Sequence, residues 1–319
     1  MSFSQEVKEE LVEVRLRRDE DGAKLVCGAV LSAASLKYSQ KLKKWGLKLV
    51  SENEPCINLI AKLAKKSYGL DNQISLNVHE RLNARNTELF LYGDNIFTLC
   101  SESGLMSIDE NGDRSYVTHL PSGLDSDHAL RAFIRGIFMM CGSVSDPRKG
   151  CHAELVFKNE QTAASVTELL SNRGIPPKLS KRRSLYVVYF KSGDTLEDFL
   201  TFMGAGGSML SVSETRMIRD AANNVNRELN CFSANLEKTA KASVSQTEDI
   251  NLIISVLGFD ALSEELYDIA KERLDNPEYS LSQLAQKLGI GRSAVNYRLK
   301  KIALIAEELR NGKKETNDK

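Results

Sequence analysis

Basic, amide and hydroxyl side chains lie close together near residue 300 of this 319-residue chain. They are Arg292, Ser293, Asn296, Tyr297, Arg298, Lys300 and Lys301. Arginine and lysine can contact guanine edges or phosphates, asparagine can pair with the edge of adenine, and serine can hydrogen-bond to several bases. Residues 281–302 contain no aspartate or glutamate that would repel a polyanion. The segment therefore has the side-chain chemistry of a DNA-binding surface.

Two short helices are expected to position these side chains. Ser280 and Gln283 have the spacing of a capping box at the start of the first helix, and Gly289 stands where a helix ends in a left-handed residue. The second helix is expected over Arg292–Ile302, because apolar residues within it recur at intervals of three and four. With Ser263–Leu274 as a preceding support helix, the pattern is typical of a helix-turn-helix. An ordinary helical hairpin with a solvated basic face is the alternative. Two further DNA contacts are expected in the first turn of the first helix, from Ser282 and Gln283.

Charge is balanced over the whole chain but segregated along it. Lysine and arginine total 43, aspartate and glutamate also total 43, and the formal net charge is zero. Two further stretches, residues 36–50 and 173–191, are basic and contain no acid. A neutral protein with such segregation can still present a face that binds phosphates. We expect secondary DNA contacts from these stretches and from a polar helical stripe near residue 220, namely from Lys41, Lys43, Lys44, Lys48, Lys181, Arg182, Arg183, Arg216, Arg219 and Arg227. A solvated strand pair is the alternative for residues 36–50, and docking of one domain on the other is the alternative for the stripe.

The first two thirds of the chain contain one order of elements twice. Helix Ala23–Leu36 precedes strands and an amphipathic helix in the first half, and helix Asp127–Cys141 opens the same order in the second. A further helix is expected to start at Asp194, because Asp194 and Glu197 have capping-box spacing. Such repetition predicts a pseudo-symmetric α/β domain.

Four segments are expected along the chain. They are a pseudo-symmetric domain over 1–208 with halves of about 1–101 and 120–208, a helical linker over 209–247, a helix-turn-helix domain over 248–310 and a polar tail over 311–319. A polar joint is expected at Ser243–Glu248. The fold class is therefore α+β, with an all-α domain after the α/β domain. The longest apolar stretches fall short of the ~18 residues that a membrane span needs.

The segment Gly136–Val144, Gly-Ile-Phe-Met-Met-Cys-Gly-Ser-Val, resembles the LAGLIDADG motif of homing endonucleases. Gly28–Leu36 occupies the same place in the first half. The resemblance implies that two motif helices pack together at a pseudo-twofold axis and that the strands form a saddle that faces DNA. It also implies that the metal-binding acid of each motif is replaced here, by Ala33 and by Cys141. Alanine offers no ligand and a neutral thiol is a poor one for Mg²⁺, so we expect neither catalysis nor a bound metal or cofactor.

Residue patterns over nearly the whole chain resemble the WhiA family of bacterial transcription regulators. The marks include Arg135-Gly-Ile-Phe, Gly142-Ser-Val-Ser-Asp-Pro147, Cys151-His-Ala-Glu154, Arg273-Leu-Asp-Asn-Pro277 and Asn296-Tyr-Arg-Leu-Lys-Lys-Ile302. The resemblance implies a cytoplasmic, nucleoid-associated regulator of sporulation or cell-division genes.

The combined expectation is a sequence-specific, non-catalytic DNA-binding regulator whose partner is double-stranded DNA. A second transcription protein is a further candidate partner, a monomer is favoured, and no association with membranes is expected. Two alternatives stay open. One is a metal-dependent DNA endonuclease of LAGLIDADG type, and the other is a protein-interaction module that brings a partner to DNA.

Overall fold

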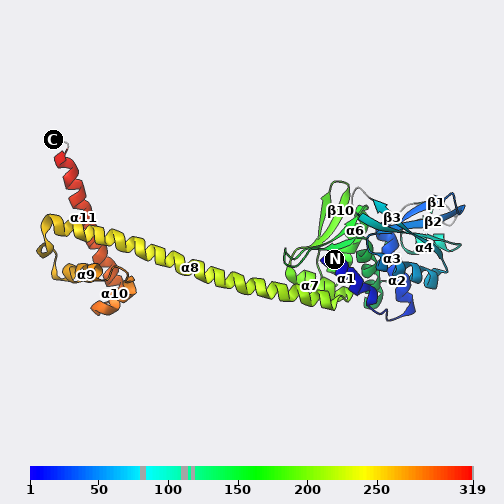
Figure 1. Ribbon diagram of the computed structural model, residues 1–319, viewed down its shortest axis with the longest axis horizontal. Helices are drawn as coiled ribbons and strands as arrows, with labels where there is room; N and C mark the ends of the chain where they lie inside the picture. Colours follow the sequence, from blue (N-terminus) through cyan, green and yellow to red (C-terminus); the bar gives the residue numbers. More distant parts are fainter. Residues whose placement is uncertain (80–83, 109–113, 116–118, 318–319) are drawn as a thin grey trace. The chain divides into compact units, whose positions relative to one another are not determined.

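Helices and strands alternate over the first two thirds of the computed structural model, and only helices follow (Figure 1). The structure describes residues 1–79, 84–108, 114–115 and 119–317. It divides into two units, Met1–Arg219 and Asp220–Lys319, and each is described by itself. None of the described helices is both long and apolar enough to span a membrane.

The first unit repeats one order of elements. Its first half contains α1 (Phe3–Glu13), α2 (Asp19–Ala33), β1 (Ser35–Ser39), β2 (Lys44–Ser51), α3 (Glu54–Tyr68), β3 (Asp71–His79), β4 (Ala84–Tyr92) and α4 (Ile96–Glu102). After the short strands β5 (Ser107–Ile108) and β6 (Arg114–Ser115), its second half contains α5 (Asp127–Cys141), β7 (Gly142–Val144), β8 (Ala153–Phe157), α6 (Glu160–Ser171), β9 (Lys178–Arg182), β10 (Leu185–Phe190) and α7 (Gly193–Met203).

The two halves build two antiparallel sheets of the same topology. Their strand orders are β1-β2-β4-β3 and β7-β8-β10-β9. Because side chains alternate along a strand, each sheet has one face packed on helices and one open face. Leu47 and Leu49 of β2 are buried on the packed face, as are Leu155 of β8 and Val188 of β10. The predicted α+β class and internal repeat are confirmed.

Helices α2 and α5 approach each other closely at two glycines. A Cβ atom added to Gly28 would lie 2.0 Å from the carbonyl oxygen of Phe133, and one added to Gly136 would lie 2.0 Å from that of Leu25. No side chain of any size fits at such distances, so only glycine allows the two backbones to meet. The contact is reciprocal, because each glycine faces the backbone of the other helix. The two motif helices therefore pack together as the resemblance implies.

Both motif helices end where a strand begins. Helix α2 ends at Ala33, not at the expected Leu36, because residues 35–39 pair with β2 and take Leu36 opposite Leu47. Helix α5 ends at the expected Cys141, and the last residues of the second motif segment, Gly142–Val144, pair with β8. Strand pairing thus ends α2 before the residue that the helical pattern predicts.

The start of α7 also differs from the expectation. Ser192, not Asp194, caps this helix by accepting the N–H of Thr195 at 3.2 Å. The capping box expected from Asp194 and Glu197 is wrong, since both carboxylates bind Arg216 instead, at 2.5 and 3.1 Å.

The described part of the second unit contains the end of one long helix, a short 3₁₀ helix (Phe259–Ala261) and three further α-helices. Helix α8 (Gly206–Leu257) is continuous, so the break expected at Ser243–Glu248 is wrong. Ser243 lies within the helix with its side chain buried, and its hydroxyl donates to the carbonyl oxygen of Pro277. A polar residue with an internal partner does not require a joint.

Helices α9 (Glu264–Asp275), α10 (Leu281–Leu288) and α11 (Arg292–Asn317) complete the second unit. Helix α11 extends beyond the expected Ile302 and includes residues 311–317 of the segment expected as a polar tail. The extension has a physical reason: Ala306 is buried in the core, and Arg310 pairs with the buried carboxylate of Asp249 at 2.6 Å.

Replacement of Gly136 by alanine tests the contact between α2 and α5. Its Cβ would overlap a backbone carbonyl, so we expect the free energy of unfolding of the first unit to fall by about 3 kcal/mol. Trp45, the one tryptophan of the chain, lies in this unit, and its fluorescence during urea unfolding gives the measurement. Gly206→Ala is the matched control, because nothing lies within 4 Å of a Cβ there. Equal stability of the two variants would show that the glycine contact is not needed.

Candidate nucleic-acid interface

One half of the surface of α11 carries the predicted DNA-contacting residues. At 100° per residue, they follow one another over about half of the helix circumference. Those on this face are exposed, namely Arg292, Ser293, Asn296, Tyr297, Lys300 and Lys301. On the opposite side Val295, Leu299 and Ile302 are 0–3% exposed and pack in the core of the second unit. The apolar face thus fixes which side chains α11 presents to solvent.

The preceding helix and its turn have the geometry expected from the sequence. The Ser280 hydroxyl accepts the N–H of Gln283 at 3.3 Å, and the Gln283 side-chain oxygen accepts the N–H of Ser280 at 2.8 Å. Gly289 has φ of 67°, in the left-handed region, and the following Ile290 donates its N–H to Ala285 at 3.0 Å. The predicted capping box and glycine stop are confirmed. They turn the chain sharply from α10 into α11, as a helix-turn-helix requires.

A buried arginine holds the loop before α10. Arg273 of α9 is 2% exposed, and its guanidinium donates to the carbonyl oxygens of Tyr279 at 2.7 Å and Pro277 at 3.4 Å. Arg273 belongs to one of the sequence patterns that resemble the family, but no role was expected for it. Its hydrogen bonds hold in place the loop that leads into the cap of α10.

Two predicted contact residues have other partners within the unit. Arg298 lies beside the apolar face, with its side chain only 20% exposed, and pairs with Glu265 of α9 at 3.5 Å. The side-chain oxygen of Gln283 is used in the capping box, whereas Ser282 is exposed. Tyr297 is exposed, and the ammonium of Lys301 lies 5.6 Å from its ring centroid. The aromatic ring and the cation therefore form one exposed patch.

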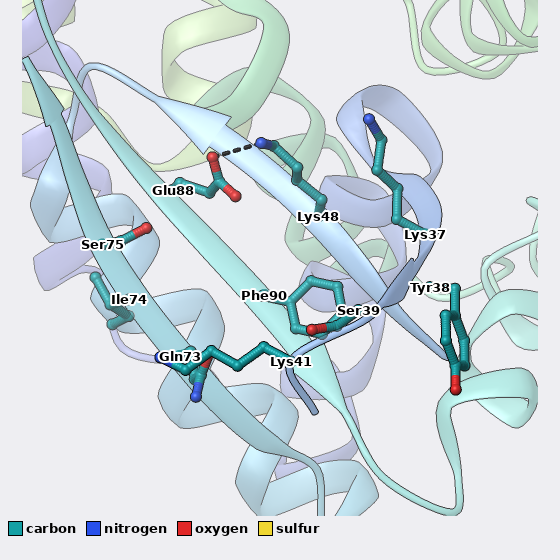
Figure 2. Close-up of a pocket in the computed structure, with 10 residues that line it drawn as sticks. All are labelled: Lys37, Tyr38, Ser39, Lys41, Lys48, Gln73, Ile74, Ser75, Glu88 and Phe90. Atoms are coloured by element: carbon teal, nitrogen blue, oxygen red, sulfur yellow. Dashed lines mark ion pairs between the residues drawn. The ribbon is translucent and has the colours of Figure 1, made fainter. Parts of the chain in front are cut away.

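The open face of the first sheet carries a basic depression of about 580 Å³. Figure 2 shows Lys37 on β1, Lys48 on β2 and Lys41 on the turn between them, with Lys48 directed at Glu88 of β4. Lys48 pairs with this carboxylate at 2.5 Å, and Lys41 also lines the depression. Lys44 belongs to the same face and lies 5.7 Å from the ring of Tyr92. Lys37 lines the depression too, although the sequence analysis did not select it. Side chains alternate along a strand, and the pairing of β1 with β2 puts Lys37 opposite Gly46, on the same face as Lys44 and Lys48. This alternation is the signal that could have identified Lys37.

The corresponding residues of the second sheet separate onto two faces. Arg182 lies on the open face and pairs with Glu154 at 3.5 Å. Lys181, its neighbour in the chain, points to the other face, where its ammonium lies 5.3 Å from the ring of Tyr186. Adjacent residues of a strand cannot both face DNA.

Two turns of the sheets contain basic residues with left-handed backbone. Lys43 lies between β1 and β2 with φ of 51°, and Arg183 lies between β9 and β10 with φ of 57°. Non-glycine residues are uncommon in this region and carry a backbone cost of about 1 kcal/mol or more. The two turns therefore place a cation at the tip of a hairpin in each half.

The polar stripe on α8 is partly occupied by contacts within the first unit. Arg216 binds Asp194 and Glu197 of α7, and these carboxylates raise its pKa. Arg219 donates to the carbonyl oxygen of Pro147 at 2.5 Å. Arg227 is exposed. These contacts lie within the first unit, so they favour neither DNA contact nor docking of one domain on the other, the two alternatives for the stripe.

The carboxyl ends of the motif helices lack the chemistry of a metal site. Ala33 and Cys141 are the last residues of α2 and α5. Burial raises the pKa of the Cys141 thiol to about 12, so the sulfur stays protonated at neutral pH. In the described part of the chain, no three histidine, cysteine, aspartate or glutamate side chains are grouped to hold a metal ion.

Family models match two parts of the chain. The WhiA LAGLIDADG-like domain matches residues 130–222, and the WhiA C-terminal HTH domain matches residues 225–306. The first includes α5 and the second sheet, and the second includes α9, α10 and the exposed face of α11.

Relatives match over nearly their whole length. The "Probable cell division protein WhiA" of Clostridium acetobutylicum is 37% identical over 320 residues, covering 97% of this chain and 99% of the relative. The protein of the same name from Clostridium botulinum strain Hall is 33% identical over 328 residues, covering 98% and 100%. The crystal structure of full-length DUF199/WhiA from Thermatoga maritima has a similar fold, with a TM-score of 0.59 and 24% identity, covering 97% of this chain and 99% of that one. A LAGLIDADG-like domain, a helix-turn-helix and these full-length relatives together show that the chain belongs to the WhiA family.

Proposed function

We propose that this chain is a sequence-specific, non-catalytic regulator of transcription that acts on cell-division or sporulation genes from the cytoplasmic nucleoid. The observation that carries the proposal is the exposed face of α11, which presents cations, an amide and a hydroxyl without an acid between residues 281 and 302. The relatives' name, cell division protein, supports the choice of target genes.

The second helix of a helix-turn-helix enters the major groove with its first residues toward the base edges. In that position Arg292 and Asn296 read bases, because arginine matches guanine and asparagine matches adenine. Lys300, Lys301 and Ser282 contact bases or phosphates at the edges of the groove. We call the exposed side of α11 the reading face; its residues are Arg292, Ser293, Asn296, Tyr297, Lys300 and Lys301. Val295 and Leu299, buried on the opposite side of the helix, keep this face directed to solvent.

The sheets supply secondary contacts that do not read sequence. Lys41, Lys43, Lys44 and Lys48 of the first half, and Arg182 and Arg183 of the second, are spread over open faces and hairpin tips. Cationic side chains on such faces attract the phosphates of DNA, and their binding releases counterions from the DNA. This contribution raises affinity for any duplex, whereas α11 provides the preference for one sequence.

The scaffold binds without cutting. Phosphodiester hydrolysis by this type of domain needs hard oxygen ligands for a divalent cation at the ends of the motif helices. The methyl group of Ala33 and the protonated thiol of Cys141 do not supply them.

Replacement of Asn296 and Lys300 by alanine tests the reading face. Each base contact is worth about 1–3 kcal/mol, so the double variant is expected to lose specific affinity by about 100-fold or more. A mobility-shift assay on the promoter fragments recovered by chromatin immunoprecipitation measures the loss. Lys271→Ala, an exposed change on α9, is the control and keeps full affinity. Unchanged binding by the double variant would refute the role of α11.

The salt dependence of binding separates phosphate contacts from base contacts. The logarithm of affinity is expected to fall linearly with the logarithm of salt concentration, by about 0.9 per phosphate contacted. Lys301→Ala is expected to reduce this slope by about one and to leave the preference between operator and unrelated DNA unchanged. If the variant instead loses the preference for operator DNA and keeps the wild-type salt slope, Lys301 contacts a base and not a phosphate.

Incubation with supercoiled plasmid and Mg²⁺ or Mn²⁺ tests the absence of catalysis. We expect the plasmid to stay supercoiled at any protein concentration, because the positions for metal-binding acids hold alanine and a protonated thiol. Gel electrophoresis gives the measurement, with EDTA as the control. Nicking that depends on the metal and persists through purification would favour the endonuclease alternative.

A further inference from the structure

One face of α8 is apolar and exposed over four turns. Val225, Leu229, Phe232 and Leu236 are each 55–66% exposed, and Ala222 precedes them on the same face. Intervals of three and four residues separate these five positions in turn. They are therefore the a and d positions of a heptad repeat, with Ala222, Leu229 and Leu236 at a. We call this surface, residues 222–236, the apolar stripe of α8.

The apolar stripe continues, in the same register, into the core of the second unit. The next a and d positions along that face are Thr239, Ser243, Gln246, Ile250 and Ile253. Ser243, Ile250 and Ile253 are at most 4% exposed, and Thr239 and Gln246 are half-buried. Helices packed around the end of α8 cover the face there, whereas the exposed side chains show that nothing in the described part of this unit covers residues 222–236. A groove of about 650 Å³ lies where the cover ends, between Phe232 and Pro277. A face this long and apolar is typical of a helix that packs against another helix.

Charges are distributed as a self-pairing helix requires. The positions that flank the seam, e and g, hold Asn226, Glu228, Ser233 and Asn235. Charged residues gather on the other side of the helix, where Glu237 pairs with Lys241 at 2.7 Å within α8. In a pair of identical helices, like charges at the flanking positions face each other and repel. A flank with a single charge avoids this repulsion and offers no charge pattern for an unlike partner.

We propose that the apolar stripe of α8 pairs with the same segment of a second copy of this chain in a two-stranded coiled coil. In parallel pairing Glu228 lies across the seam from Ser233, and in the antiparallel register that aligns residue 229 with residue 232 it lies across from Asn235, so neither arrangement brings it against another acid. The expectation from the sequence was a monomer. Because α8 is continuous from Gly206 to Leu257, the apolar stripe and the buried positions that follow it lie on one helix. The inference is independent of the proposed function, since it concerns only protein–protein contact.

Sedimentation equilibrium of the full chain at rising concentration tests the pairing. The mass of the wild type is expected to rise from 35.5 kDa toward twice that value. Leu229→Glu combined with Phe232→Glu places charges in the seam and is expected to weaken association by at least about tenfold. Both side chains are exposed in the single chain, so the variant folds, and its helical circular dichroism at low concentration stays that of the wild type.

Ala234→Glu is the matched control, because it adds an acid to the same helix on the side opposite the seam. This variant is expected to associate like the wild type. A wild type that stays monomeric at every concentration would overturn the proposal, as would equal loss of association in the control and the seam variant. A heavier species that contains a different polypeptide would also overturn it, because the stripe would then belong to another partner.

Discussion

The first unit depends on a backbone contact between α2 and α5. Gly28 faces the carbonyl oxygen of Phe133, and Gly136 faces that of Leu25, each so closely that a Cβ atom would overlap it. A glycine within a helix costs about 1 kcal/mol relative to alanine. Burial of the surrounding apolar residues of both helices, among them Leu25, Val26 and Ile137, offsets this cost.

The same contact sets the positions of the strands and of Ala33 and Cys141. Because α2 runs directly into β1 and α5 into β7, the crossing of the two helices orients the first strand of each sheet. The remaining strands follow by antiparallel pairing in the same order. Ala33 and Cys141 come at corresponding ends of the two helices for the same reason. The LAGLIDADG-like domain thus brings the ends of its two motif helices to corresponding places, where Ala33 and Cys141 offer no carboxylate.

The second unit relies on buried polar contacts that hold short helices at fixed angles. Arg273 fixes the loop before α10, Ser243 binds the same loop from α8, and Asp249 binds Arg310 of α11. A small helical core supplies limited apolar burial, so satisfied buried polar groups contribute specificity to its geometry. The exposed face of α11 is oriented by these contacts together with the apolar side of the helix.

Local patterns determined much of this protein. The capping box at Ser280, the glycine stop at Gly289, the bounds of α5 and the repeat of the two halves follow from short-range chemistry and periodicity, and the structure agrees. Where the sequence alone was misleading, a partner distant in the sequence was the reason. Pairing of β1 with β2 ends α2 before Leu36, and Asp194 pairs with Arg216 instead of capping α7.

Tertiary structure alone decided which of the predicted side chains are presented to solvent. The sequence grouped Lys181 with Arg182, but strand alternation separates them, and it grouped Arg298 with its neighbours, but Glu265 pairs with it. It also could not show that α8 passes uninterrupted through a polar segment, because Ser243 satisfies its hydroxyl at a residue 34 positions away. The sequence by itself determined the family, the repeat and the chemistry of the reading helix, since these depend on residue types and on local spacing. The partners of each side chain were decided only in the folded chain, because they come from parts of the sequence that local patterns do not connect.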